Sequence, residues 1–331
     1  MAAPVSEQRR AAELNVLVRK QRSLWRDAWW RLTRNKAAML GLALILLFCA
    51  VAIFAPAIAP YGPTDSFTDN GKRAPTLLEP AILCPAPPTL CWVRAQYTDP
   101  RYPLGTDDIG RDILSRLIYS ARISMVVGFI PVSLIFLIGV SVGMVAGYAG
   151  GWTDNILMRF TDFIYAFPDL LFLILIMATL RNTALGDVLG GLALLFVGLA
   201  IVNWVGMARL MRGQVLGLKE KEFFEAARAI GVGPLRIMVR HLFPNALAPI
   251  IVAVAFAVPG AILTEAALGY LGIGIKPPTP TWGVMINDGF TVFSATPWAV
   301  LSPAICIAIV LLSFTFVGDG LRDALDPRMK T

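Results

Sequence analysis

The chain has little charge for its length. Of its 331 residues only 15% are Asp, Glu, Lys or Arg, while 56% are hydrophobic. Soluble domains carry about a quarter charged residues, so this balance excludes a soluble globular protein. The net charge of +7 needs no nucleic acid to explain it, because basic residues also gather on one side of membrane proteins.

Residues that carry chemistry are equally scarce. There is one histidine, His241, and no Gly-x-x-x-x-Gly-Lys phosphate loop, so ATP binding by that route is not expected. No pairing of a nucleophile with a base is apparent, which leaves catalysis with little support. We therefore expect a protein that is not an enzyme and that has no cofactor and no metal site.

Long apolar runs predict six transmembrane helices and an all-α, polytopic membrane protein. About 20 apolar residues cross the hydrocarbon core as a helix, which satisfies its own backbone hydrogen bonds in lipid. The expected spans are Ala37–Ala59, Ile123–Tyr148, Phe163–Leu180, Val188–Met207, Ala246–Leu268 and Trp298–Val317. The first span is too long for the core of a signal peptide, so we expect it to be retained.

The spans divide the chain into parts. These are an amino-terminal segment (1–36), the first span (37–59), an external loop (60–122), a five-helix core (123–318) and a carboxyl-terminal tail (319–331). Basic residues number 20 in the amino tail, the second and fourth loops and the carboxyl tail, against 9 in the other loops. Because positive residues stay cytoplasmic, both termini and the loop 208–245 are predicted to face the cytosol.

The four cysteines fall into two groups. Cys49 and Cys306 lie within spans and are expected to be small buried hydrophobic residues. Cys84 and Cys91 flank a proline-rich stretch of the external loop, in a compartment that permits disulfides. A bridge there would pin the loop, and both the bridged and the free state stay open.

Two further segments carry structural expectations. The amino tail alternates basic and apolar residues, which is typical of an amphipathic segment on the inner membrane surface or of a simple positive-inside anchor. In the external loop, Asp107 and Asp108 mark a plausible helix start. We expect an interfacial helix that feeds the second span, with one apolar and one basic face. The apolar face comprises Ile109, Ile113, Leu117 and Ile118. The basic face comprises Arg111, Arg116 and Arg122.

The cytosolic loop predicts two helices joined by a turn. A first helix covers Leu218–Ile230, with Phe223, Ala226, Ala227 and Ile230 on one face. Gly231 and Gly233 break it, and Pro234 suits the first turn of a short second helix. The apolar stripe of that helix comprises Leu235, Met238, Val239 and Leu242. Periodicity alone leaves open whether this knob packs under its own spans or docks into a partner.

The same loop carries a family signature. Glu225-Ala226-Ala227, Gly231 and Pro244 resemble the E-A-A-x3-G-x9-I-x-L-P motif of ABC importer permease subunits. Here the I-x-L part reads His241-Leu242-Phe243, the form found in the dipeptide/oligopeptide branch. Blocks at Leu104-Gly105-Thr106-Asp107 and Leu271-Gly272-Ile273-Gly274 are also similar to that branch. The resemblance covers roughly Trp30 to Ala324 and points to the "C"-type subunit.

This resemblance implies a type I (MetI-like) permease core in a bacterial cytoplasmic membrane. The chain would form half of a translocation pathway. Its partners would be a second homologous permease subunit, two ABC ATPase subunits, an extracytoplasmic substrate-binding protein, the peptide substrate and membrane lipid. The resemblance assigns ATPase coupling to Glu225, Ala226, Ala227, Arg228, Gly231, Pro234, Arg240, His241 and Pro244.

Individual roles follow from the resemblance. Gly231 would permit the turn, and Glu225 would pair with a base or cap a helix end near the ATPase. Ala226 and Ala227 would allow close approach. For Arg228, Arg236 and Arg240, attraction to anionic lipid is the alternative to ATPase contact.

Few acids lie near the spans. Glu265 is the one acid within a predicted span and is therefore a functional candidate. Its alternative is a place near the external end of the fifth span, with hydrogen bonds to neighbouring backbone. Asp162 and Asp169 are expected at the two interfaces of the third span. Nickel or another small solute is the alternative to peptide as substrate, and a membrane scaffold or sensor is the alternative from another class.

Overall fold

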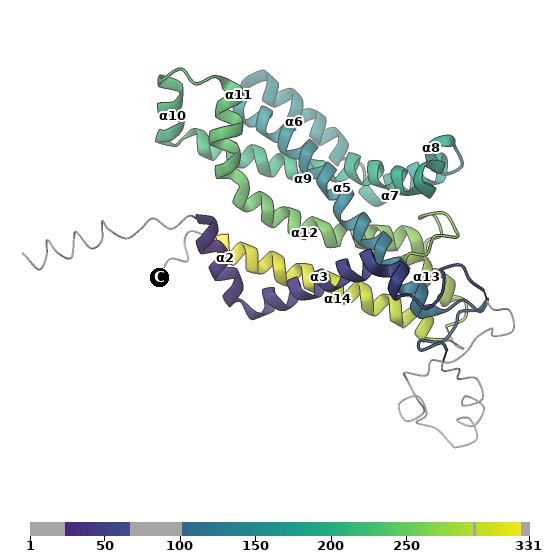
Figure 1. The fold of residues 1–331 in the computed structure, drawn as a ribbon. Coiled ribbons are helices and arrows are strands. Elements are labelled where there is room, and N and C mark those ends of the chain that lie inside the picture. The colour runs from purple at the N-terminus through teal and green to yellow at the C-terminus, as the bar shows by residue number, and fades with distance from the viewer. Residues whose placement is uncertain (1–23, 67–100, 294–295, 326–331) are drawn as a thin grey trace, which may run out of the picture.

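The structure, a computed structural model, describes residues 24–66, 101–293 and 296–325 as a helical assembly (Figure 1). In this part extended pairing is limited to two isolated β-bridges, and the predicted all-α class is confirmed. The helical elements are α2 (Leu24–Arg34), α3 (Lys36–Ile58), α5 (Ile113–Ala149), α6 (Gly151–Tyr165), α7 (Asp169–Leu180), α8 (Ala184–Asp187), η2 (Val188–Gly191), α9 (Leu192–Lys219), α10 (Glu222–Ala229), α11 (Pro234–Arg236), η3 (Ile237–Leu242), α12 (Phe243–Tyr270), α13 (Trp282–Phe290) and α14 (Trp298–Leu325).

Five helical stretches in the described residues are long and apolar enough to cross a membrane. They are Lys36–Ile58, Ile113–Ala149, Ala184–Lys219, Pro234–Tyr270 and Trp298–Leu325. Each stretch contains most of one predicted span. Four of them extend beyond the predicted span at one or both ends, and Lys36–Ile58 is shifted from its predicted span by one residue. The short helix α13, between the last two of them, has no counterpart among the predicted elements.

The third predicted span, Phe163–Leu180, is wrong as a continuous helix. The chain forms α6 and α7 instead, bent by 73° at a short break. Pro168 stands at the break and precedes the first residue of α7. Proline lacks an amide hydrogen and disfavours helical conformation in the residue before it, which is Phe167. The pair counts as a sixth span only if the two bent halves cross together.

The helix predicted before the second span starts later than its sequence indicates, at Ile113. Residues 105–110 form turns in which Gly105 and Gly110 have φ of 76° and 80°. The helix begins after Asp112, whose carboxylate accepts a hydrogen bond of 2.8 Å from the amide of Ser115. From Ile113 it runs without interruption to Ala149, so residues 113–122 form a helix that continues directly into the second span, and only the residues up to Asp112 form the turns.

Helix α5 lies at the centre of the fold and packs along α9 (Figure 1). Three glycines four residues apart, Gly139, Gly143 and Gly147, face α9. A Cβ at Gly139 would lie 2.6 Å from the Cβ of Met207, and one at Gly147 would lie 2.8 Å from the Cβ of Val215. Small residues at this spacing let two membrane helices approach closely, so α5 and α9 form a rigid pair.

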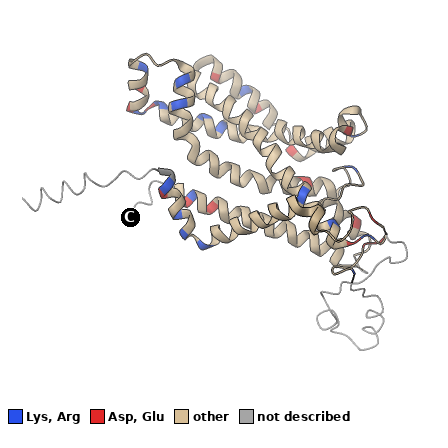
Figure 2. Cartoon of the chain, viewed as in Figure 1, with Lys and Arg blue, Asp and Glu red and all other residues tan. Residues whose placement is uncertain are grey.

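The two ends of the helix bundle differ in content. Elements α10 and α11 lie at the same end as α2 and the last turns of α14, whereas α8 and α13 lie at the opposite end (Figure 1). Lys and Arg residues gather at the α10 end (Figure 2). There α2 packs on α14 through Ala28, Leu32 and Ala324, and it exposes Trp29 and Trp30. Residues 1–23, which carry most of the predicted amphipathic tail, lie outside the described residues.

Candidate functional site: the α10–α11 elbow and the α6–α7 break

The loop between α9 and α12 folds into two helical arms, and we call residues 222–242 the elbow. The predicted helix Leu218–Ile230 is interrupted at Glu220 and Lys221, so that α10 begins only at Glu222. Before the interruption, Lys219 Nζ donates hydrogen bonds of 3.1 and 3.0 Å to the carbonyls of Gly147 and Tyr148. These bonds tie the end of α9 to the end of α5, at the base of the elbow.

Gly231 forms the turn between the two arms. Its φ is 75°, and the amide of Val232 donates to the carbonyl of Ala227 over 3.1 Å, which is the closing bond of a Schellman motif. A Cβ at Gly231 would meet nothing within 4 Å. Backbone conformation, not space, therefore selects glycine here, as the sequence predicts.

The second arm continues directly into the fifth long helix. It begins at Pro234, widens to a π-helix over Ile237–Leu242 and enters α12 at Phe243. Pro244 has no amide hydrogen for the carbonyl of Arg240, so the α-helical pattern is interrupted where the helix widens. The predicted short, separate helix is thus the first part of a 37-residue helical stretch.

One face of the elbow is buried against the bundle. Phe224, Ala227, Ile237 and Leu242 pack in a cluster with residues of α5 and α9. The Phe224 ring meets Tyr148 edge-on, with 6.3 Å between ring centroids. The sequence placed Phe223 and Ile230 on a shared face with Ala227, and that grouping is wrong because both side chains point away from this cluster.

The other face leaves apolar side chains uncovered. Phe223, Ile230, Leu235 and Val239 are 37%, 80%, 71% and 60% exposed. Of the nine residues assigned to coupling, Ala227 is buried and His241 is half-buried, and the other seven are exposed. Glu225 forms no salt bridge to a described residue, and it lies in the first turn of α10, where a negative charge complements the helix dipole. The Arg228 guanidinium lies over the Phe224 ring at 6.0 Å.

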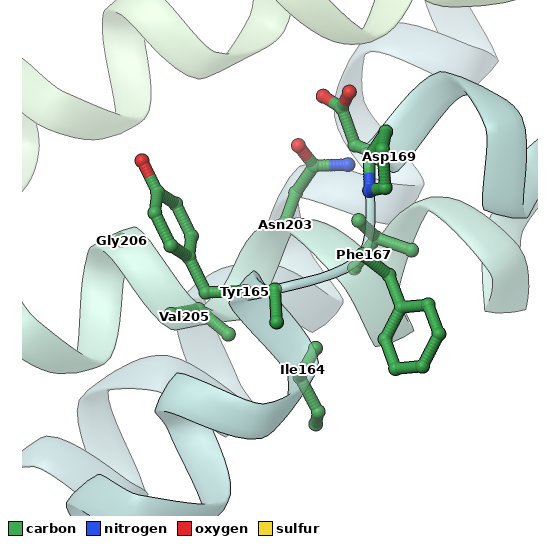
Figure 3. A pocket seen from close by; sticks show the side chains of 10 residues that line it. Ile164, Tyr165, Phe167, Asp169, Asn203, Val205 and Gly206 are labelled. Atoms are coloured by element: carbon green, nitrogen blue, oxygen red, sulfur yellow. The ribbon is translucent and has the colours of Figure 1, made fainter.

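A pocket of about 510 Å³ opens at the α6–α7 break. Tyr165, Phe167 and Asp169 line it from the break, and Asn203 and Gly206 line it from α9 (Figure 3). The expectation that Asp162 and Asp169 lie at the interfaces of a third span stays a prediction. Both acids lie close to the break, inside the bent pair. Pro168 was the signal in the sequence that could have located this pocket.

A charged cluster at the opposite end was missed altogether. Asp107 Oδ2 accepts from Arg111 Nε and Arg116 Nη1, each at 2.6 Å. Asp288 Oδ2, in α13, accepts from the same two arginines at 3.1 and 2.9 Å. We call these four residues the clamp. It joins the turn before α5 to α13, so Arg111 and Arg116 are not the polar face of an interfacial helix.

The remaining predicted sites have mixed outcomes. Glu265 lies in the last two turns of α12 and is fully buried. Neither of its carboxyl oxygens has a hydrogen-bond partner among the described residues, so the expected bonds to neighbouring backbone are absent. Cys49 and Cys306 are free, partly buried thiols. Cys84 and Cys91 lie outside the described residues. Within the described residues, no cluster of His, Cys, Asp or Glu could hold a metal ion.

Comparison with known proteins gives concordant matches. Residues 139–331 match the family described as binding-protein-dependent transport system inner membrane component. Residues 23–80 match the N-terminal TM domain of oligopeptide transport permease C.

Individual relatives match over nearly their whole length. The oligopeptide transport system permease protein OppC of Bacillus subtilis is 38% identical over 97% of this chain and 95% of its own. The dipeptide transport system permease protein DppC of Haemophilus influenzae is 39% identical over 92% and 95%. The glutathione transport system permease protein GsiD of Escherichia coli O6:K15:H31 is 36% identical over 97% and 98%.

A solved structure matches the fold. A chain of the inward-facing MetNI methionine ABC transporter superposes with a TM-score of 0.51 at 18% identity. The match covers 65% of this chain and 98% of that chain. At this identity the likeness concerns the fold alone, and it confirms the predicted type I permease core.

Proposed function

We propose that this chain, which belongs to the family of binding-protein-dependent transport system inner membrane components, forms half of the pathway of an ATP-driven importer for di- and oligopeptides. The family and the long apolar helices make it a multi-pass inner-membrane protein. Peptide is favoured over nickel because the similar permeases named above serve peptides, including glutathione.

The partners proposed are a second homologous permease subunit, two ATPase subunits that hydrolyse ATP, and an extracytoplasmic binding protein. A second permease is supported by the surface of α6. Trp152, Phe163 and Tyr165 are 80%, 64% and 67% exposed there. Beside them Asp162 and Arg209 form an exposed ion pair of 2.8 Å. Charged side chains in membrane helices face a protein interior or a water-filled cavity, so this face suits a partner subunit and a pathway.

The elbow is the proposed contact with an ATPase, and its exposed apolar face is the observation that carries this proposal. Burial of one large apolar side chain contributes about 1.5–3 kcal/mol, so Ile230, Leu235 and Val239 would supply a strong anchor. An anionic lipid surface is the alternative for the arginines, and it would repel Glu222 and Glu225 on the same helix. A protein groove can accommodate both signs of charge.

The orientation proposed places the elbow and both chain ends in the cytosol. The elbow, α2 and the end of α14 occupy the end of the bundle where Lys and Arg gather (Figure 2). Positive residues are retained on the cytoplasmic side. The pocket at the α6–α7 break and the clamp then lie progressively farther toward the outside.

Motion of the elbow would pass into the bundle through two rigid connections. Phe224 and Ile237 are embedded against α5 and α9, and the second arm continues into α12 without a break. An ATPase that pulls the elbow would therefore tilt α12 together with the α5–α9 pair. Such a rigid-body switch requires elbow contacts that differ between the two states of the ATPases.

The test uses the complete importer and two exposed positions. Ile230→Asp and Glu225→Lys should leave the permease in the membrane, because neither side chain is buried. We expect peptide uptake to fall at least roughly tenfold, the equivalent of about 1.4 kcal/mol, with loss of the ATPase subunits on purification or with ATP hydrolysis that no longer follows uptake. Normal coupling in both variants would remove the elbow from the mechanism.

The turn offers a matched pair. Gly231→Val forces a β-branched residue into φ of 75°, where such residues are strained. Gly233→Val makes the same change at φ of −64°, and a Cβ there also meets nothing within 4 Å. We expect the first variant to uncouple hydrolysis from uptake and the second to retain most coupling. Equal behaviour of the two would contradict a role for the turn geometry.

A further inference from the structure

The α6–α7 break holds a carboxylate deep within the bent helix pair. Asp169 is the first residue of α7, which has 12 residues, and α6 before the break has 15. At about 1.5 Å per residue these arms extend about 18 and 22 Å from the break. The hydrocarbon core is about 30 Å thick. The two halves together are apolar enough for one broken span, and on that assignment Asp169 lies between the two membrane surfaces.

This carboxylate is exposed on the chain, yet lipid is an unfavourable neighbour for it. Asp169 and Asn203 are both exposed, and both line the pocket of about 510 Å³. Their polar groups and the Tyr165 hydroxyl point to the same side of the ribbon (Figure 3). Because charged side chains within a membrane face water-filled cavities or other protein, this side of the pocket must border the pathway or the partner subunit.

The hydrogen bonds of the pocket leave acceptors open. Asp169 Oδ1 accepts from the amide of Leu170 at 2.8 Å, and Oδ2 accepts from no described residue. Asn203 Nδ2 donates to the carbonyl of Leu199 at 3.0 Å, which leaves its Oδ1 facing the pocket side. A nearby cation, Arg209, is already engaged with Asp162 at 2.8 Å and lies 4.4 Å from the Tyr165 ring.

The net electrostatic sign of the pocket is negative. The amino end of α7 contributes roughly half a positive charge, which would favour an anion. Asp169 contributes a full negative charge at the same place, and it forms no salt bridge to a described residue. The pocket thus offers oxygen acceptors and an uncompensated negative charge, which together select a cation that donates hydrogen bonds.

We propose that Asp169, together with Asn203 and Tyr165, forms a subsite for the α-ammonium group of a peptide in transit. The proposal rests on the proposed function of peptide import. An ammonium group supplies three donors and one positive charge in a compact group, which matches Asp169 Oδ2 and Asn203 Oδ1. The pocket volume falls within the range of about 300–1,000 Å³ typical of small-molecule sites, so a first residue with its side chain also fits.

Two substitutions at Asp169 separate charge from local structure. Asp169→Asn removes the charge but keeps an oxygen that can accept from the Leu170 amide. Asp169→Glu keeps the charge but moves the carboxylate away from that amide. In proteoliposomes that contain the complete importer and saturating loaded binding protein, we expect Asp169→Asn to lower the maximal uptake rate of alanyl-phenylalanine about tenfold. We expect Asp169→Glu to retain most of it.

The substrate arm of the experiment uses N-acetyl-alanyl-phenylalanine, which lacks the ammonium group. Rates are compared as variant over wild type for each substrate, so discrimination by the binding protein cancels. Asp169→Asn should change the rate for the acetylated dipeptide less than twofold. If wild type does not carry that dipeptide, the double variant Asp169→Asn with Asn203→Leu replaces this arm. Its effect should be smaller than the sum of the single effects, because both residues serve one ligand group.

Several outcomes would overturn the subsite. They are an Asp169→Asn importer with wild-type rates, equal losses for both dipeptides, additive effects in the double variant, or equal failure of the Asn and Glu variants. Assembly of each variant complex is checked by its subunit stoichiometry after purification. If wild type imports no peptide at all, the proposed function fails; if wild type imports and Asp169→Asn matches it, only the subsite fails.

Discussion

The two ends of this molecule treat charge in opposite ways. In the clamp, two arginines and two aspartates pair with each other, and the Arg116 and Asp107 side chains are only 4% and 6% exposed. In the elbow, Glu225, Arg228 and Arg240 are exposed and form no salt bridge to a described residue. The charges of the clamp find their partners within one chain, whereas the elbow has charges and apolar side chains that no described residue covers.

This difference separates structural from functional polar residues. A buried charge without its partner is strongly destabilising, so residues of the clamp can be tested by stability alone. An exposed charge contributes little to stability, so the exposed charged residues of the elbow should act only through a partner. If substitutions of charged residues at the two ends had similar effects on folding, burial would not be what distinguishes the clamp from the elbow.

The largest effect on stability is expected from Arg116→Met. Removal of this guanidinium leaves Asp107 and Asp288 with Arg111 alone, in a site where Asp107 is nearly inaccessible to water. The loss of one partner of a buried ion pair costs about 3–5 kcal/mol. We expect a clearly lower midpoint in thermal or denaturant unfolding of the purified permease, and a low yield in the membrane.

Arg122 supplies the matched control, since it is an exposed arginine of the same helix, α5. Arg122→Met should change stability by no more than about 0.5 kcal/mol. Similar midpoints for Arg116→Met and wild type would mean that the clamp does not hold α13 to the start of α5.

A smaller effect is expected from Asp112→Ala. The Asp112 carboxylate accepts hydrogen bonds from the amide and hydroxyl of Ser115 at 2.8 and 2.6 Å, and it caps α5. Loss of such a cap costs about 0.5–2 kcal/mol. Unfolding of the purified protein should show this decrease, and Asp112→Asn, which retains an oxygen acceptor, should show less of it.

The same residue adds a dependence on pH. Burial raises the pKa of Asp112 above its usual value of 3.8, although the hydrogen bonds from Ser115 act in the opposite direction. The folded state therefore holds this proton more tightly than the unfolded state, and stability falls as pH rises from 3.8 through the raised pKa. The difference in stability between wild type and Asp112→Asn should change across this window, and a constant difference would contradict the shift.

Hydropathy predicted the long helices well because each one satisfies its backbone within its own sequence. Helix α3, Lys36–Ile58, differs from its predicted span by one residue at each end. The α6–α7 break was missed because an apolar window averages over Pro168. The clamp was missed because Asp288 is 172 positions away from Arg116, and no periodic pattern indicates such a contact.

In the elbow, the local sequence predicts the turn but not which face of α10 is buried. The residue type of Gly231 alone predicts a turn, and in the structure Gly231 has the positive φ that such a turn requires. The buried face was assigned wrongly because α10 has apolar residues on both sides. Phe224 is buried and Phe223 is exposed, and only the position of α5 and α9 decides between these neighbours.

The smallest effect is expected from Asp187→Asn, at the same end of the bundle as the clamp. Asp187 accepts from Lys276 Nζ over 2.6 Å, but its side chain is 70% exposed. Exposed ion pairs contribute about 0–1 kcal/mol and are screened by salt. The amide of Lys276 also donates to the carbonyl of Gly190 at 3.2 Å, and this bond survives the substitution. We expect an unfolding midpoint close to wild type, and closer still at high salt. A loss as large as that of Arg116→Met would show that location at this end, and not burial, determines what a charge contributes.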